Sequence, residues 1–420
     1  MKRSYFVVAL IMLIFFVISF ITNVIGPLIP DIIKGFSLSL TLVALLPFAF
    51  FIAYGVMSIP SGILIEKYKE KKILAAAFVV AFIGSAILAL FPGYLSAVLS
   101  LFLIGCGMAM LQVVAYPLLR TSGGEEHYAF NAVLAQLIFG FASFLSPIVY
   151  SYLVLNLDNK NETDHGIFKI LHSFVPTDLP WISLYWLFTV ICLAMVIIIL
   201  VSKFPKVELS QDEKPGALQT HLMLLKNPMV ILFFLAIFCY VGSEQGIANW
   251  MSQYLSSYHG YDPQTTGAHA VAYYWGLMTA GGVVGLLLLK VMDSRKVLII
   301  FTSLALVCLS LALFGPARVS LFSFASMGFF ASVMYPVIFS LALNSVKEHH
   351  GSFSGILITG IIGGAVIPLI IGWIGDMFGL KTGMYFLYLT LAYILSVGFW
   401  ARPLITNKTI NLTKREEEIS

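Results

Sequence analysis

Charge is scarce in this sequence. Of its 420 residues only 10% are Asp, Glu, Lys or Arg, whereas 60% are hydrophobic, and the mean hydropathy is +0.95. A soluble globular domain carries about 25% charged residues. A chain of this composition cannot fold as a water-soluble globule, so that class is excluded. The composition indicates a polytopic helical membrane protein, because the apolar runs are too long for the strands of an outer-membrane barrel.

Cysteine and catalytic clusters are equally sparse. The four cysteines all lie in apolar runs, with no CxxC spacing and no nearby His; they are Cys106, Cys192, Cys239 and Cys308. We expect them to be small buried hydrophobic residues and not disulfide or metal ligands. The sequence also has no His/Asp or paired-carboxylate cluster of the kind that a membrane enzyme needs. We therefore predict no enzymatic activity, no metal site and no cofactor.

Long apolar runs take the place of charge. A spanning helix needs about 20 apolar residues, and the sequence has twelve such runs, at 5–27, 41–65, 73–92, 95–119, 129–153, 182–202, 229–255, 267–290, 297–315, 319–343, 353–375 and 383–401. The first run is too long for the core of a signal peptide and has no small-residue cleavage site, so we expect it to be a spanning helix. The predicted fold class is an all-α polytopic membrane protein with twelve transmembrane helices.

Basic residues predict the orientation of these helices. If the N-terminus is cytoplasmic, the cytoplasmic connections and tails hold 19 of the 24 Lys and Arg residues, and the outer loops hold five. The opposite orientation would invert that ratio. Because Lys and Arg accumulate on the cytoplasmic side of membrane proteins, we expect both termini in the cytoplasm. The apparent absence of other targeting segments and the short loops suggest a bacterial inner membrane.

The two parts of the chain repeat one another. Tyr116-Pro117 lies in the fourth predicted helix, and Tyr335-Pro336 lies at the same place in the tenth, 219 residues later. A long polar segment falls between the copies. We predict an N-terminal six-helix half at 1–202, a cytoplasmic linker at 203–228, a C-terminal half at 229–402 and a tail at 403–420. Two parallel six-helix halves resemble the architecture of the major facilitators.

Glu244 is the acidic residue that lies well inside a predicted helix. An ionisable group at membrane depth costs several kcal/mol, roughly 2.5–3.5 on insertion scales, and is a functional-site hypothesis by default. If the protein couples to protons, Glu244 would hold a proton when buried and release it when hydrated. If it couples to sodium, the carboxylate with Ser243 or Gln245 would supply oxygen ligands. Glu244 could also bind substrate without titrating.

Polar and aromatic residues at mid-depth are candidates for binding a solute. Amides and carboxylates bond to hydroxyl groups, and aromatic rings pack against the apolar faces of a solute. The candidates are Asn23, Gln112, Gln136, Glu244, Gln245, Asn249, Tyr116, Tyr274, Trp275 and Tyr335. Buried amides also join neighbouring helices, so each amide has a packing alternative. No Lys or Arg lies in the middle of a predicted helix, which favours a neutral substrate.

The loop between the second and third predicted helices carries a further motif. Gly62 is followed by Glu66 and then by the basic pair Lys71 and Lys72. This pattern resembles the major facilitator signature in the same loop, although that signature usually has Asp at position 66, Gly at 69 and Arg at 71. We expect Gly62 to allow close helix packing and Glu66 to pair across the two halves in one conformation. The alternative is a loop that is merely basic.

Several motifs resemble the fucose:proton symporter family and its glucose/galactose permease branch. They are Tyr335-Pro336 with Phe339 to Leu341, the run from Thr359 to Gly364 with Pro368 and Asp376, Tyr240 to Glu244, and Tyr274 to Gly276. The resemblance covers essentially the whole chain and implies sugar transport. In that family, proton coupling is tied to an Asp on helix one and a Glu on helix four. Gly26 and Gln112 occupy those positions here, whereas the family's Asn and Gln are retained as Asn23 and Gln136.

We therefore predict a secondary active transporter that moves a neutral hexose or deoxyhexose by alternating access, in symport with H⁺ or Na⁺. Sugar uniport and transport of a non-sugar solute, such as a lipid, drug or organic anion, are the alternatives, and a solute sensor on the same fold is a further one. The expected partners are the sugar, the coupling cation and the lipid bilayer. We expect no nucleic-acid partner and a monomer.

Overall fold

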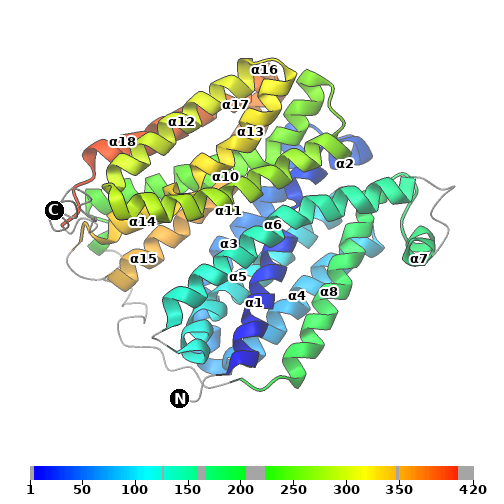
Figure 1. The fold of residues 1–420 in the computed structure, drawn as a ribbon. Helices are drawn as coiled ribbons and strands as arrows, with labels where there is room; N and C mark the ends of the chain where they lie inside the picture. The colour runs from blue at the N-terminus through cyan, green and yellow to red at the C-terminus, as the bar shows by residue number, and fades with distance from the viewer. Residues whose placement is uncertain (1–3, 125–126, 159–165, 205–222, 347–349, 405–420) are drawn as a thin grey trace, which may run out of the picture.

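The structure is a bundle of helices (Figure 1). It is a computed structural model that describes the whole chain except residues 1–3, 125–126, 159–165, 205–222, 347–349 and 405–420. Within the described residues the regular elements are helices, and strands do not occur. Twelve helical spans are long and apolar enough to cross a membrane, which confirms the predicted twelve. The chain is a multi-pass membrane protein.

The first half of the chain supplies six of the twelve spans. Its elements are α1 (Tyr5–Thr22), α2 (Ile25–Phe36), α3 (Leu40–Tyr68), α4 (Glu70–Leu90), α5 (Tyr94–Gly123), α6 (Tyr128–Asp158), the short α7 (Ile167–Phe174), the 3-10 turn η2 (Pro180–Ile182) and α8 (Ser183–Val201). Helices α1 and α2 together form the first span. Most of the predicted linker and all but two residues of the tail lie outside the described residues, so the domain boundaries stay a prediction.

The second half supplies the other six spans. Its elements are α10 (Pro228–His259), the turn η4 (Pro263–Gly267), α11 (Ala268–Val291), α12 (Ser294–Phe314), α13 (Ala317–Ala331), α14 (Met334–Leu343), α15 (His350–Thr359), the 3-10 turn η5 (Gly360–Ile362), α16 (Gly363–Phe378), α17 (Leu380–Met384) and α18 (Phe386–Trp400). Helices α13 and α14 form the tenth span, and most of α15, with η5 and α16, forms the eleventh.

The two halves pack their helices in the same pattern. In the first half α5 packs against both α3 and α4, and α4 also packs against α8. In the second half α13 packs against both α11 and α12, and α12 also packs against α18. Lys71 at the start of α4 donates to the carbonyl of Leu200 at 2.7 Å, and Arg295 at the start of α12 donates to the carbonyl of Ala401 at 3.5 Å. The internal repeat is thus a repeat of structure.

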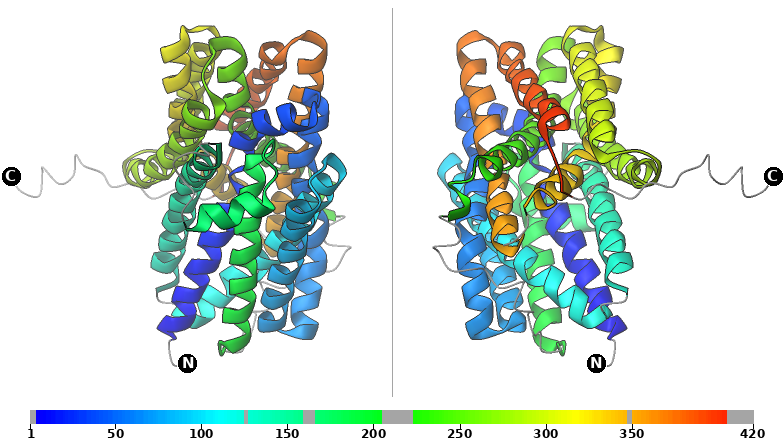
Figure 2. Two further views of the ribbon diagram at one scale, coloured as in Figure 1. Left: turned by 90° about the vertical axis from the view of Figure 1, so that its right-hand side faces the viewer. Right: turned by 90° about the vertical axis from the view of Figure 1, so that its left-hand side faces the viewer.

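The two halves lie side by side in the bundle (Figures 1 and 2), and three helix pairs make the most extensive contacts between them among the described residues. Helix α3 packs against α16, α6 against α11, and α2 against α10. We call the end of the bundle opposite the chain termini the distal end. There the backbones meet closely, because Gly26 of α2 lies against the carbonyl of Ala248 in α10, and Gly372 of α16 lies against the carbonyl of Leu40 in α3.

Prolines interrupt two of the spans. A proline inside a helix has no N–H and its ring clashes with the carbonyl four residues earlier. Pro27 accordingly follows the break at Asn23, where α1 ends, and Pro336 follows the break at Ser332, where α13 ends. Pro117 also lies inside a helix, but α5 continues through it without a break. The first and tenth spans are therefore built from two helical pieces each.

One boundary in the first span was predicted wrongly. The predicted run ends at residue 27, which leaves Asp31 outside it. The helix instead continues through α2 to Phe36. Pro27 lies in the first turn of that second piece, where a missing N–H disturbs little, and α2 also accommodates Pro30 in its interior. Asp31 is therefore a helical residue, and it is buried.

A larger side chain should destabilise the protein at one of two neighbouring glycines on α11 and have little effect at the other. A Cβ on Gly281 would collide with the backbone of Phe329 in α13, whereas a Cβ on Gly282 would meet open space. We expect Gly281→Leu to lower the free energy of unfolding by about 1–3 kcal/mol through overpacking, and Gly282→Leu to change it by less than about 0.5 kcal/mol. Apparent melting temperatures of the two purified variants in detergent measure this difference, and equal melting temperatures would contradict the packing argument.

Candidate functional site

Glu244 lies at the centre of α10. From Cys239 to Trp250 every residue is buried except Glu244, which is partly exposed. The hydroxyl of Tyr240 donates to its carboxylate, and Nε2 of Gln245 lies 3.2 Å from Oε1. The hydroxyl of Tyr274 on α11 donates to the backbone carbonyl of Glu244 at 3.4 Å. The carboxylate is thus held by two donors of its own helix, and the backbone beside it by a donor from α11.

A linked group of tyrosines adjoins this carboxylate. We call it the tyrosine cluster; three members neighbour Glu244 and two join them through Tyr335, and the members are Tyr54, Tyr116, Tyr240, Tyr274 and Tyr335. The rings of Tyr240 and Tyr335 lie 5.8 Å apart. The hydroxyl of Tyr54 interacts electrostatically with those of Tyr116 and Tyr335. Because Tyr54 and Tyr116 come from the first half and the others from the second, the cluster spans the interface between the halves.

Three members of this cluster are predicted from the sequence and two are not. Of the predicted three, Tyr274 and Tyr335 lie near Glu244, and Tyr116 lies near Tyr335 and Tyr54. Tyr240 was not among the predicted site residues and entered only as the start of a family motif. Its position one helical turn before Glu244 nevertheless places both side chains on one face of the helix. Tyr54 has no signal in the sequence, because the contact between α3 and the second half is made only by the tertiary fold.

Two predicted residues of the second half present buried donors. Asn249 on α10 is buried, and its Nδ2 has no hydrogen-bond partner among the described residues. Trp275 packs edge-on against Tyr274, with ring centroids 5.2 Å apart, and its Nε1 likewise has no partner in the described part of the chain. Buried donors are almost always paired in native proteins, so both are suited to meeting a polar group that enters between the helices.

The three amides of the first half take different positions. Asn23 is buried at the break between α1 and α2, and its Nδ2 donates to Ser143 at 2.8 Å and to Ser19 at 3.3 Å. It therefore joins α1 to α6 inside one half. Gln136 on α6 is exposed, and one turn further Gly140 touches Thr279 of the other half. Gln112 on α5 is partly exposed, one turn before Tyr116.

Ser243 does not take part in the site. Its hydroxyl lies 2.6 Å from that of Thr390 on α18, and both side chains are buried. Successive residues of a helix point about 100° apart, so Ser243 is turned into the packing between α10 and α18. The suggestion that Ser243 would share a sodium ion with Glu244 is therefore wrong for this conformation.

Gly26 also has a structural explanation. It occupies the position at which the fucose:proton symporter family carries an Asp, and here it lies against the carbonyl of Ala248. Any larger side chain would hold α2 away from α10 at this point. Helices α2 and α10 therefore could not approach this closely if residue 26 carried a carboxylate.

The loop motif lies at the end of the bundle that carries the termini. Lys71 holds the carbonyl of Leu200 within the first half, and Lys72 is exposed. Glu66 lies on α3, two residues before its end. Gly62 has open space where a Cβ would be, so the expected close helix packing at Gly62 does not occur in this conformation. Lys71 acts as a basic cap on a helix C-terminus.

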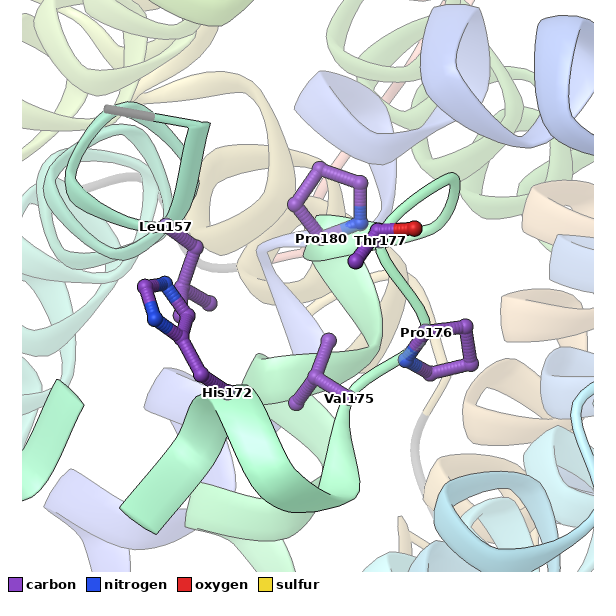
Figure 3. A pocket seen from close by; sticks show the side chains of 6 residues that line it. All are labelled: Leu157, His172, Val175, Pro176, Thr177 and Pro180. Atoms are coloured by element: carbon purple, nitrogen blue, oxygen red, sulfur yellow. The ribbon is translucent and has the colours of Figure 1, made fainter. Parts of the chain in front are cut away.

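The other parts of the described chain have fewer features of a functional site than the surroundings of Glu244. No group of three His, Cys, Asp or Glu side chains that could hold a metal ion occurs among the described residues. A small surface pocket lies under α7, lined by Leu157, His172, Val175, Pro176, Thr177 and Pro180 (Figure 3). It contains none of the predicted site residues. The midplane around Glu244 is therefore the candidate functional site.

Comparison with known proteins gives consistent results. The sequence matches the profile of the Major Facilitator Superfamily over residues 11–361 and 233–418. It is 30% identical over 410 residues to the glucose/galactose transporter of Brucella abortus biovar 1 (strain 9-941), covering 94% of both chains. It is 26% identical over 397 residues to the L-fucose-proton symporter of Escherichia coli (strain K12), covering 90% of this chain and 89% of that one.

A solved structure shares this fold. The fold superimposes with a TM-score of 0.78 on a bacterial homologue of the human lysosomal transporter Spinster, whose structure is inward-facing and unoccupied. The two proteins are 14% identical, and the match covers 95% of this chain and 98% of the other. At that identity the likeness concerns the fold. The close contact of the halves at the distal end agrees with a conformation closed at that end.

Replacement by Ala should change the free energy of unfolding at Asn23 but not at Gln136. We expect Asn23→Ala to lower the free energy of unfolding by about 0.6–1.7 kcal/mol, the range for interhelical hydrogen bonds in membranes. Gln136→Ala should leave stability unchanged within about 0.5 kcal/mol, because an exposed side chain away from packing contributes little. Chemical or thermal unfolding of the purified variants gives both values, and equal losses would contradict the assignment of Asn23 to packing.

Proposed function

The chain belongs to the major facilitator superfamily, and on that premise we propose that it is a secondary active transporter that moves a neutral sugar across the membrane by alternating access. The observation that carries this proposal is the position of Glu244. It is partly exposed at mid-depth, and it lies within a tyrosine cluster to which both halves contribute. A solute bound there contacts both halves, as alternating access requires.

The chemistry of the site supports a sugar as the solute. Carboxylate and amide oxygens accept from sugar hydroxyls, while tyrosine hydroxyls and amide N–H groups donate to them. Tyrosine and tryptophan rings cover the apolar face of a pyranose. The sequence has no Lys or Arg at mid-helix, which disfavours an anion. The relatives named above are a glucose/galactose transporter and an L-fucose-proton symporter, and we propose a hexose or deoxyhexose.

We propose the proton as the coupling ion and Glu244 as the residue that carries it. The Escherichia coli relative is named a proton symporter. Tyr240 and Gln245 place a hydroxyl and an amide group on the carboxyl group of Glu244, and such groups can bond to either protonation state of a carboxyl. Sodium is the weaker choice, because Ser243 is turned toward Thr390 and away from the carboxylate.

The conformation and the sidedness complete the proposal. We propose that the distal end faces the outside of a bacterial inner membrane, because the other end carries most of the Lys and Arg residues. With the distal end closed by contacts between α2 and α10 and between α3 and α16, the site is then reached from the cytoplasm. Both termini are cytoplasmic in this proposal, and the transporter acts as a monomer.

Uniport is the second candidate, and one observation favours it. Gly26 and Gln112 stand where the fucose:proton symporter family carries its Asp and Glu. In this packing Gly26 cannot be replaced by a carboxylate without separating α2 from α10. A protein without those two groups could let sugar equilibrate without drawing on an ion gradient, unless Glu244 takes their place.

Transport by the wild type and by a Glu244 variant distinguishes symport from uniport. Wild-type protein in proteoliposomes should accumulate glucose, galactose or fucose under an inward proton gradient and not under a sodium gradient. We expect Glu244→Gln to abolish this accumulation while sugar exchange across the membrane continues, because the amide keeps hydrogen-bonding capacity but carries no proton. Equilibration without accumulation in both proteins would establish uniport, and accumulation retained by the variant would exclude Glu244 as the carrier.

The tyrosine cluster generates a separate prediction about affinity. Loss of one hydroxyl that bonds to the sugar should weaken binding by about 0.5–1.5 kcal/mol, or about two- to tenfold. We therefore expect Tyr54→Phe to raise the dissociation constant of the transported sugar by that factor. Tyr393→Phe is the matched control, since that hydroxyl donates to the carbonyl of Leu232 within the second half. Isothermal titration measures both, and equal constants for the two variants would remove Tyr54 from the site.

A further inference from the structure

Asp376 near the end of α16 bonds to the start of α3 in the other half. Its Oδ1 accepts from the backbone N–H of Leu40 at 2.8 Å, and its Oδ2 accepts from the backbone N–H of Thr41 at 2.8 Å. The hydroxyl of Thr41 also donates to Oδ2. The first N–H groups of a helix have no partner within the helix, and a carboxylate there is favoured by the helix dipole. Helix α3 is thus capped by a residue of the opposite half.

Asp31 makes a second connection between the halves at the distal end. It is buried on α2, where the hydroxyl of Tyr150 on α6 donates to it at 2.6 Å. From the other half, Nε2 of Gln264 in η4 lies 3.2 Å from both carboxylate oxygens. Gln264 is itself fixed, because Asp262 accepts from its backbone N–H at 3.1 Å.

These bonds cannot persist when the distal end opens. Asp376 and the start of α3 belong to different halves, and so do Asp31 and Gln264. Any rotation that separates α3 from α16 and α2 from α10 removes both sets of bonds. The contact between Asp31 and Tyr150 lies within one half and would remain. The bonds from Asp376 to α3 and from Gln264 to Asp31 therefore stabilise the closed distal end specifically, because they exist only while the two halves meet there.

We propose that Asp376 and Asp31 form a latch that holds the distal end closed and so sets the balance between the two access states. Asp376 supplies a helix cap from the opposite half, and Asp31 supplies a buried acceptor for Gln264. They act as positioning residues, since neither contacts the tyrosine cluster in the structure. This inference rests on the alternating access in the proposed function, but its test does not need transported sugar.

A reporter cysteine can measure the opening of the distal end. Ala44 on α3 is fully buried and faces Gly372 of α16 across the halves. In a protein whose four native cysteines are replaced by Ala, Ala44→Cys should react slowly with a water-soluble maleimide in detergent. We expect Asp376→Ala to speed this reaction about three- to tenfold, from the loss of charge-assisted hydrogen bonds at a partly solvated site. Asp376→Asn should lie between, since it keeps one acceptor oxygen.

The second connection gives a variant that spares the buried carboxylate. Gln264→Ala removes the bond between the halves while Asp31 keeps Tyr150, and we expect it to speed labelling of Ala44→Cys by about two- to tenfold, the range for the loss of one typical hydrogen bond. Together with Asp376→Ala the effects should multiply, because the two connections lie on different helix pairs.

Two controls distinguish latch opening from loss of structure. Asp293→Ala removes a cap from α12 within its own half, and it should leave labelling of Ala44→Cys unchanged. A reporter at Ala81→Cys, buried between α4 and α5 inside the first half, should label equally slowly in every variant. Faster labelling at both reporters would mean general loosening and would overturn the latch, as would unchanged labelling of Ala44→Cys in Asp376→Ala and Gln264→Ala.

Discussion

A carboxylate at mid-depth in an apolar chain is the constraint on which the rest of the structure depends. Glu244 lies in a helix whose neighbouring residues are buried, and a charged group in such surroundings is costly unless polar groups meet it. Tyr240 and Gln245 meet it from its own helix, and Tyr274 bonds to its backbone from α11. The polar groups form a small island between the halves, and the surrounding helices are apolar packing that keeps this island in place.

The same constraint explains why the molecule is divided into two halves. A polar site buried in lipid must be reached by water and solute, and a bundle of two parallel repeats provides access by moving one repeat against the other. The interface is built for such movement. Glycines at 26 and 372 let backbones touch without interlocking side chains, and the bonds from Asp376 and Asp31 lie at the distal end. Contacts of this kind can be made and released without disturbing either half.

Residues of the same chemical type serve different purposes according to where the fold places them. Asn23 and Asn249 are both amides at mid-depth, yet Asn23 joins α1 to α6 through Ser143, whereas the Nδ2 of Asn249 has no partner within the described residues. In the sequence, Asp31 and Asp376 each lie just beyond the end of a predicted apolar run. In the structure, each of them connects the two halves. Local sequence cannot separate these cases, because the partner in each bond lies more than a hundred residues away.

The sequence by itself determined the class, the twelve spans and the repeat, and it singled out Glu244 as a candidate. Each of these follows from local composition, since apolar length decides what crosses a membrane and an isolated acid within such a run has to be explained. Only the tertiary structure decided that Tyr54 joins the site, that Ser243 leaves it, and that Gly26 and Asp31 belong to the closed distal end. Those facts depend on which helices face one another, and helix packing is set by the whole set of surfaces and not by any one segment.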